Sequence, residues 1–292
     1  MRDGHMGGGA GQILDEAVEP RPSRPVRKDE IVIAERGLYV ESWLPERRSR
    51  RKPLYLLHGE LCGSWLWERY LSYFAQRGWE GHALNLRAHF WSETADLASL
   101  DMDSYLADAR AGLEALGRPA VLVGHGLGAL LALKLAESHE ALGLVLISPA
   151  LPKPIRPEPP AHVVRLVPAT FRQELIGWAG PVDHIRRQDP DLSEADVSRI
   201  QHLMGAESGA ARRQMLAGVP IERTALEGIP ALVLGGGADR LFPAAESERL
   251  AEWLGAGYQH LPDHSHFGLV VGERAHEGAA DAIRTFLEVH RL

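Results

Sequence analysis

The sequence predicts an α/β fold, in which helices cover both faces of a mostly parallel, twisted sheet and a helical cap is inserted into the chain. Two observations lead to this prediction. From Pro53 onward, short apolar runs alternate with segments of helical length, a pattern typical of βαβ units. The alternation stops at Pro149 and resumes at Pro230, which indicates an insertion rather than a second sheet.

The bulk composition agrees with one enzyme-sized domain. The chain has 292 residues, 45% of them hydrophobic, enough to bury one substantial core. Its net charge of -7 and short arginine runs do not favour nucleic acid as a partner. Cys62 is the single cysteine, which excludes an internal disulfide and fits a reducing compartment. No apolar run reaches the roughly 18 residues of a membrane helix, and no signal peptide is recognisable. We therefore expect a cytoplasmic protein without a membrane partner.

The first elements are predicted from glycine, proline and apolar spacing. Residues 1–29 are rich in Gly and then in Pro and Arg, and are predicted to form a mobile arm. A hairpin follows over 30–35 and 38–44, separated by Arg36-Gly37. The subsequent elements are a strand at 53–58, a helix near 66–76, a strand at 82–86, a helix at 102–116, a strand at 120–124, a helix at 127–137 and a strand at 142–148.

The segment 149–226 is predicted to be the helical cap, and residues 30–148 and 227–292 the α/β core. Five prolines between Pro152 and Pro160 prevent regular structure at its start. Several helical pieces follow, with no strand expected between them. The alternation then resumes with a strand at 230–235, a helix at 244–254, a strand at 257–261 and a helix at 279–289.

The sequence VLVGHGLGAL, residues 121–130, carries the most informative turn of the chain. Its glycines Gly124 and Gly128 flank the turn as in the nucleophile elbow G-x-S-x-G, but Gly126 stands where that pattern has serine. Because glycine has no side-chain oxygen, it cannot attack a carbonyl carbon. A covalent serine mechanism is therefore excluded at this position.

Two further motifs follow predicted strands, at the sheet edge where open α/β folds place their sites. His58-Gly59-Glu60 ends one strand, and a glycine turn of this kind can present backbone N–H groups to an oxyanion. Asp239 follows a later strand, and His266 lies near the end of the chain.

From about residue 30 onward the chain resembles the α/β-hydrolase superfamily, in which elbow, acid and histidine occur in this order. The resemblance implies that Asp239 orients His266, which acts as general base. It also implies an oxyanion hole made by the N–H groups of Glu60 and Leu127. His264 is the weaker candidate for the base, since the family's histidine directly precedes a bulky residue, here Phe267. The predicted substrate-binding residues are His58, Gly59, Trp65 and His125, and no metal or cofactor is expected.

The chain departs from the family in a second place. The common loop Arg-Gly-His-Gly-x-Ser occurs here as residues 87–92, Arg-Ala-His-Phe-Trp-Ser. A single substitution at the elbow does not explain this loop, which favours natural divergence, although whether Gly126 is native stays open. Ser64, Ser92 and Ser148 are conceivable substitute nucleophiles, but none lies in a glycine-flanked strand-to-helix turn.

The sequence thus predicts a protein that acts on a carbonyl-containing small molecule by general-base hydrolysis or lyase-type chemistry. The bond is expected to be an ester, thioester or carbon–carbon bond. Two alternatives stay open: a catalytically silent protein that binds a small molecule, and a serine esterase inactivated at Gly126. The predicted apolar ceiling of the pocket consists of Phe171, Ile176, Trp178, Leu203, Met204 and Met215.

Overall fold

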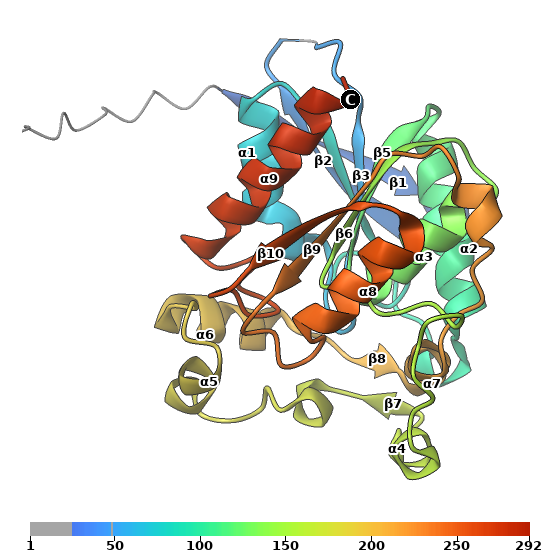
Figure 1. Ribbon diagram of the computed structural model, residues 1–292, viewed down its shortest axis with the longest axis vertical. Helices are drawn as coiled ribbons and strands as arrows, with labels where there is room; N and C mark the ends of the chain where they lie inside the picture. Colours follow the sequence, from blue (N-terminus) through green and yellow to red (C-terminus); the bar gives the residue numbers. More distant parts are fainter. Residues whose placement is uncertain (1–24, 48) are drawn as a thin grey trace, which may run out of the picture.

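An eight-stranded sheet forms the centre of the computed structural model, which describes residues 25–47 and 49–292 (Figure 1). The strand order is β1-β2-β4-β3-β5-β6-β9-β10. β2 pairs antiparallel with β1 and β4, and the other neighbours pair in parallel. The predicted mostly parallel sheet is confirmed. Most of the predicted arm, residues 1–24, lies outside the described residues.

The central strands are buried along their whole length, as expected for a sheet covered on both faces. β1 begins at Val26, whereas the sequence placed the first strand at Glu30. Backbone pairing with β2, from Val26 opposite Pro45 to Ile33 opposite Leu38, extends this edge strand through polar residues that face solvent. The strands are β1 (Val26–Ile33), β2 (Leu38–Pro45), β3 (Leu54–Leu57), β4 (Gly81–Asn85), β5 (Ala120–His125), β6 (Ala141–Ile147), β9 (Ala231–Gly236) and β10 (Gly257–Leu261).

Helices cover both faces of the sheet, and each face has its own apolar cluster (Figure 1). α1 (Glu68–Gln76) and α9 (Ala275–Val289) lie on one face. α2 (Met102–Leu116), α3 (Leu127–Ala136) and α8 (Ala244–Leu254) lie on the other. The short 3-10 helices of this part are η1 (Ala34–Arg36), η2 (Ser64–Trp67) and η3 (Leu97–Ser99).

The segment between β6 and β9 forms the cap beside the carboxyl end of β6. The prediction of no strand in this segment was wrong. β7 (Thr170–Phe171) and β8 (Glu207–Ser208) form a small antiparallel pair, and two-residue strands are too short to leave a period in the sequence. The helices are α4 (Ala161–Leu166), η4 (Gln173–Ile176), α5 (Val182–Gln188), α6 (Glu194–Leu203), α7 (Gly209–Ala217) and η5 (Arg223–Leu226).

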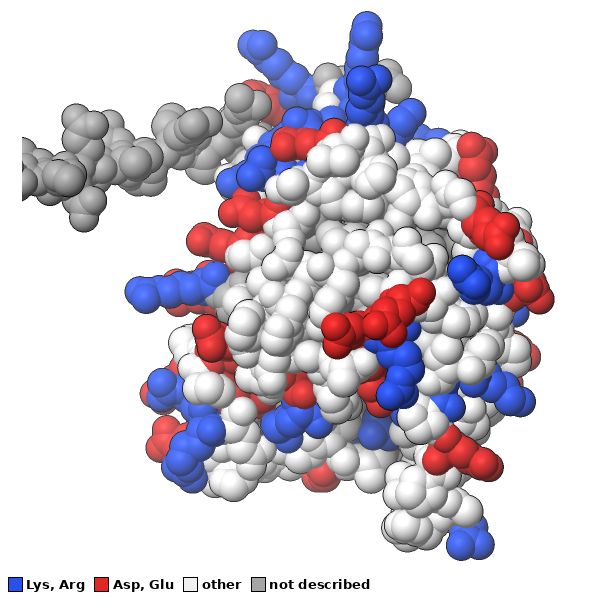
Figure 2. Space-filling model, viewed as in Figure 1, with Lys and Arg blue, Asp and Glu red and all other residues white. Residues whose placement is uncertain are grey.

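Figure 2 shows charged side chains of both signs around the margin and over the lower part of this face, while its upper centre carries few charges. The arginine-rich segment 46–52 connects β2 to β3, and the guanidinium of Arg51 lies 3.5 Å from the centre of the Trp79 ring. None of the described helices is long and apolar enough to cross a membrane.

Candidate active site

The turn between β5 and α3 places Gly126 at φ 55° and ψ -117°. This conformation costs a residue with a side chain on the order of 1–3 kcal/mol. The flanking glycines are required by packing, since a Cβ at Gly128 would lie 2.1 Å from the carbonyl oxygen of Leu57. A Cβ at Gly126 would instead make ordinary contacts, 3.7 Å from the His266 ring and 3.8 Å from Cα of Gly59. The space at Gly126 therefore accepts a Cβ atom, although the backbone conformation is strained for any residue other than glycine.

His266 and Asp239 are paired as the resemblance implied. Nδ1 of His266 lies 2.9 Å from Oδ2 of Asp239. Oδ1 of Asp239 accepts hydrogen bonds from the N–H groups of Leu241 and Phe242, each at 2.8 Å. Burial acts to raise the pKa of Asp239, but the charge of His266 and these hydrogen bonds hold it below its usual value. The ionised carboxylate fixes the proton on Nδ1, so Nε2 is the basic nitrogen and lies on the Gly126 side.

The imidazole of His266 is held between two rings. The Phe242 ring stacks on it at 5.0 Å, and the ring of His125 lies 4.1 Å away. Nε2 of His125 donates a hydrogen bond to the backbone carbonyl of His266 at 3.1 Å. Burial, and then the charge of His266, lower the pKa of His125 well below its usual value. His125 is thus a neutral residue that supports the loop of His266.

The two N–H groups predicted to form the oxyanion hole lie next to the elbow. Leu127 is the first residue of α3, so its N–H has no partner within the helix. The N–H of Glu60 belongs to the turn after β3, whose Gly59 lies against Gly126. The N–H of the next residue, Leu61, is bound by a carboxylate oxygen of Glu207 at 3.1 Å, which fixes this turn.

A cavity of about 70 Å³ lies between this edge of the sheet and the cap. Gly126, Leu127, Glu60 and His266 line it from the sheet side. Of the predicted ceiling residues, Ile176 and Met215 line it, while the other four pack into the apolar core. The rest of the wall is formed by Arg156, Arg212, Leu216, Leu241, Phe242 and Phe267.

The four predicted substrate-binding residues lie behind the cavity wall rather than in it. His58 donates from Nδ1 to the Gly59 carbonyl at 2.8 Å and accepts at Nε2 from the N–H of Leu86. Burial lowers its pKa to about 3, so this ring is a neutral link between β3 and β4. Trp65 and His125 are buried. Contact of these residues with substrate stays a prediction. The structure does not favour it, because none of the four residues lines the cavity.

The three serines also lie outside the cavity wall. Ser64 donates to the carboxylate of Glu41 at 2.7 Å, and Ser92 donates to the carbonyl of Asn85 at 2.6 Å. Ser148 is buried after β6 at φ 42°. Cys62 is buried, and burial raises the pKa of its thiol.

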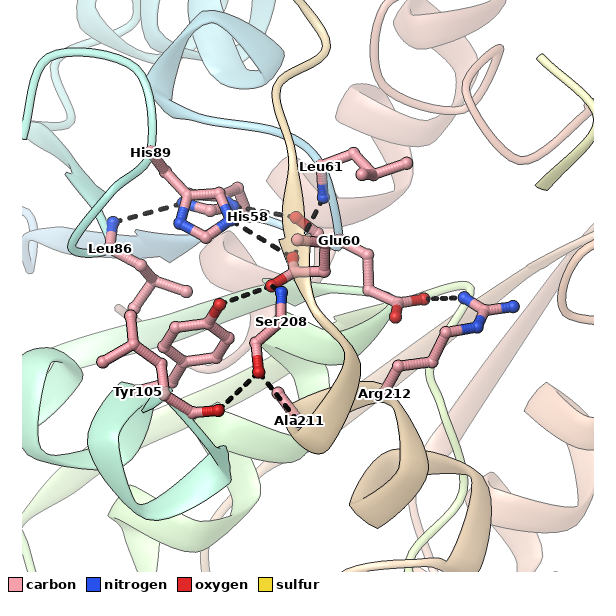
Figure 3. A network of polar contacts seen from close by, with 12 residues as sticks. His58, Glu60, Leu61, Leu86, His89, Tyr105, Ser208, Ala211 and Arg212 are labelled. Atoms are coloured by element: carbon pink, nitrogen blue, oxygen red, sulfur yellow. Dashed lines mark hydrogen bonds and ion pairs between the residues drawn. The ribbon is translucent and has the colours of Figure 1, made fainter. Parts of the chain in front are cut away.

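A buried polar cluster joins the cap to the turn after β3 (Figure 3). The carboxylate of Glu207, in β8, accepts hydrogen bonds from His89 at 3.2 Å, from the hydroxyl of Tyr105 and from the N–H groups of Leu61 and Ser208. Burial opposes ionisation of Glu207, yet the charge of His89 and these donors lower its pKa to about 2. The unusual loop 87–92 thus supplies the partner of a buried carboxylate.

Sequence reasoning missed three charged residues of this region: Arg156, Arg212 and Glu207. Arg212 belongs to α7, and its Nη1 donates to Oε2 of Glu60 at 2.6 Å. The two residues are 152 positions apart in the chain, and no local pattern signals such a contact.

The comparisons with known proteins agree with this fold. Residues 54–282 match the model of the alpha/beta hydrolase family, and the chain belongs to this family. No curated protein sequence matches the chain.

Solved structures of similar fold are esterases and lipases. A monoacylglycerol lipase of Paleococcus ferrophilus is 22% identical, with a TM-score of 0.67 over 87% of this chain and 99% of its own. An esterase of Thermogutta terrifontis is 20% identical, with a TM-score of 0.67 over 91% of this chain and 100% of its own. An esterase of Exiguobacterium antarcticum is 18% identical, with a TM-score of 0.67 over 86% and 95%.

Proposed function

We propose that this protein cleaves a carbonyl-containing small molecule by general-base catalysis, with His266 as the base and without a covalent intermediate. The observation that carries the proposal is the position of His266. Its Nδ1 is held by Asp239 at 2.9 Å, and its ring faces the space at Gly126 inside the cavity. A water molecule between His266 and Gly126 would occupy the place of the serine hydroxyl in the elbow pattern G-x-S-x-G.

The steps for an ester follow from this geometry. Nε2 of His266 takes a proton from water while the water oxygen forms a bond to the carbonyl carbon. The N–H groups of Glu60 and Leu127 donate hydrogen bonds to the negative oxygen of the tetrahedral intermediate. The protonated imidazole then gives its proton to the leaving alkoxide as the carbon–oxygen bond breaks, and an acid and an alcohol are released. Asp239 stays ionised throughout and stabilises the imidazolium.

The same base supports a second chemistry, removal of a proton from the substrate itself in a lyase-type reaction. Because a Cβ fits at Gly126, a serine esterase that was inactivated at this position is still an alternative. We also propose that the partner of this protein is a small molecule and that the protein is located in the cytoplasm.

Two variants test the proposal against short acyl esters. His266→Ala should abolish turnover, and a serine-directed fluorophosphonate should leave the parent protein unlabelled. If the parent is inert and Gly126→Ser becomes an esterase, the parent is a disarmed hydrolase and the proposal is wrong. Turnover that survives His266→Ala would contradict it as well.

A further inference from the structure

Two arginines of the cap line the cavity that contains His266. Arg212 donates from Nη1 to Oε2 of Glu60 at 2.6 Å (Figure 3). Arg156 donates from Nε to the carbonyl of Leu216 at 2.8 Å. Its Nη1 is buried and makes no hydrogen bond to any described residue, and the carboxylate of Glu246 faces it at 3.9 Å, beyond hydrogen-bond distance. One guanidinium nitrogen in this wall therefore lacks an acceptor.

Glu60 is the second incompletely paired group. Its side chain is 8% exposed, and its Oε1 is buried without a hydrogen-bond partner among the described residues. Burial raises the pKa of Glu60 to about 7. The charge of Glu207 adds to this shift, and the charges of Arg212 and His266 oppose it. The ionised form of Glu60, which neutralises Arg212, is therefore disfavoured by its surroundings. A buried polar group without a partner carries a desolvation penalty, which is larger when the group is charged, so the arrangement favours a ligand that satisfies these groups.

We infer that Arg156 and Arg212 form a subsite for a carboxylate of the substrate, so that the natural substrate is a short acyl compound with a negative charge. The planar guanidinium matches a carboxylate with two parallel hydrogen bonds. The small cavity, of about 70 Å³, fits a short acyl chain better than a lipid tail. This inference rests on the proposed function for the reacting end of the substrate, whereas the subsite can be tested by binding alone.

Binding of the carboxylate has a consequence for Glu60. The incoming anion competes with Glu60 for Arg212, and its negative charge further disfavours the ionised form of Glu60. Glu60 then takes up a proton, and its protonated carboxyl can donate a hydrogen bond to the ligand. Ligand binding near neutral pH is thus expected to be coupled to proton uptake.

The test uses succinate and succinamide, which have similar shapes but differ in charge, and neither is a substrate for ester hydrolysis. In titration calorimetry with the full chain, succinate should bind at least tenfold more tightly than succinamide. Arg156→Gln and Arg212→Gln should each weaken succinate binding at least tenfold. Arg165→Gln removes a charge from an exposed position of the cap and serves as the matched control, with unchanged affinity.

Equal affinity for the two compounds, or succinate binding unchanged in both cavity variants, would overturn the subsite. The lysine variants Arg156→Lys and Arg212→Lys guard against misfolding, since they keep the charge and should bind with intermediate affinity. The heat of succinate binding should depend on the ionisation enthalpy of the buffer in the parent and not in Glu60→Gln. Absence of this dependence in the parent would contradict the displacement of Glu60.

A kinetic experiment distinguishes this inference from the proposed function. Monomethyl succinate should be hydrolysed with a higher kcat/KM than dimethyl succinate, and Arg156→Gln should remove the preference. If succinate binds through both arginines but no ester is cleaved, the subsite stands and the hydrolytic function fails. If esters are cleaved through His266 without any preference for charge, the function stands and the subsite fails.

Discussion

Asp239 and Glu60 are two buried carboxylates of one site, and they differ in how fully they are paired. Both oxygens of Asp239 accept hydrogen bonds, and its pKa is lowered. Glu60 has one paired and one unpaired oxygen, and burial raises its pKa to about 7. A fully paired carboxylate fixes the base in one geometry, whereas a half-paired one beside two arginines can change partner. The difference separates a rigid part, which we propose to be catalytic, from a cavity wall that we propose to bind a ligand.

The largest effect is expected at the rigid part. Asp239→Asn should lower kcat by about 10⁴-fold, the size of the corresponding effect in a serine protease, because the amide no longer selects the tautomer with a basic Nε2. Asp239 does not line the cavity, so KM should change little. Steady-state kinetics check both values. A kcat close to that of the parent would show that Asp239 does not orient the base.

The buried cluster behind the turn extends the rigid part to the cap. Glu207→Gln removes the carboxylate that raises the pKa of His89, so the buried imidazole either keeps an unpaired charge or gives up its proton. The free energy of unfolding should fall by about 3 kcal/mol. Chemical denaturation measures this loss. In the double variant with His89→Gln, part of the stability should return, because the buried imidazole that has lost its carboxylate partner is then absent. Identical losses in the single and double variants would mean that the two residues are not coupled.

Gly126→Ser should have a smaller effect on stability, but it should give the protein a reactivity that the parent lacks. The strained backbone should cost about 1–3 kcal/mol of unfolding free energy, while the new hydroxyl beside His266 should react with a fluorophosphonate. Gly126→Ala is the matched control, with the same strain and no oxygen. If alanine and serine variants both fail to react, the remaining parts of the site are not arranged for acyl transfer.

The smallest effect is expected from the titration of Glu60. Its pKa rises from 4.5 to about 7 on folding, so between these values the folded chain binds more protons than the unfolded chain. The contribution of Glu60 to stability is therefore present at low pH and is lost as the pH rises toward 7. Glu60→Gln should remove this loss, seen by comparing denaturation curves of parent and variant from pH 5 to pH 8. Parallel stability profiles would contradict the raised pKa.

Local signals were sufficient for most elements of the fold. The predicted bounds of α2, α8 and β10 agree with the structure. For α2 the reason is visible, since Asp101 forms a capping box with Ser104 and Gly117 ends the helix in the left-handed conformation. The order of elbow, acid and histidine likewise predicted that Asp239 and His266 lie together, as they do at 2.9 Å, because strand ends of a parallel sheet meet at one edge.

The contacts that the sequence did not reveal join distant segments. The bond between Leu61 and Glu207 spans 146 positions, and β8 with its two residues has no period to detect. Arg156 and Arg212 belong to a segment without strand–helix alternation, where no motif distinguishes a cavity residue from a surface one. Packing of the cap against the sheet determines these positions, and the local spacing of residues in the sequence does not reveal that packing.

Pre-steady-state turnover of a short p-nitrophenyl ester by the parent protein, followed by optical release and intact mass together, tests the central claim most directly. Direct attack by water predicts linear release from the first turnover, no change in protein mass, and loss of the rate in His266→Ala. A burst that matches the protein concentration, together with an acylated residue, would contradict catalysis without a covalent intermediate.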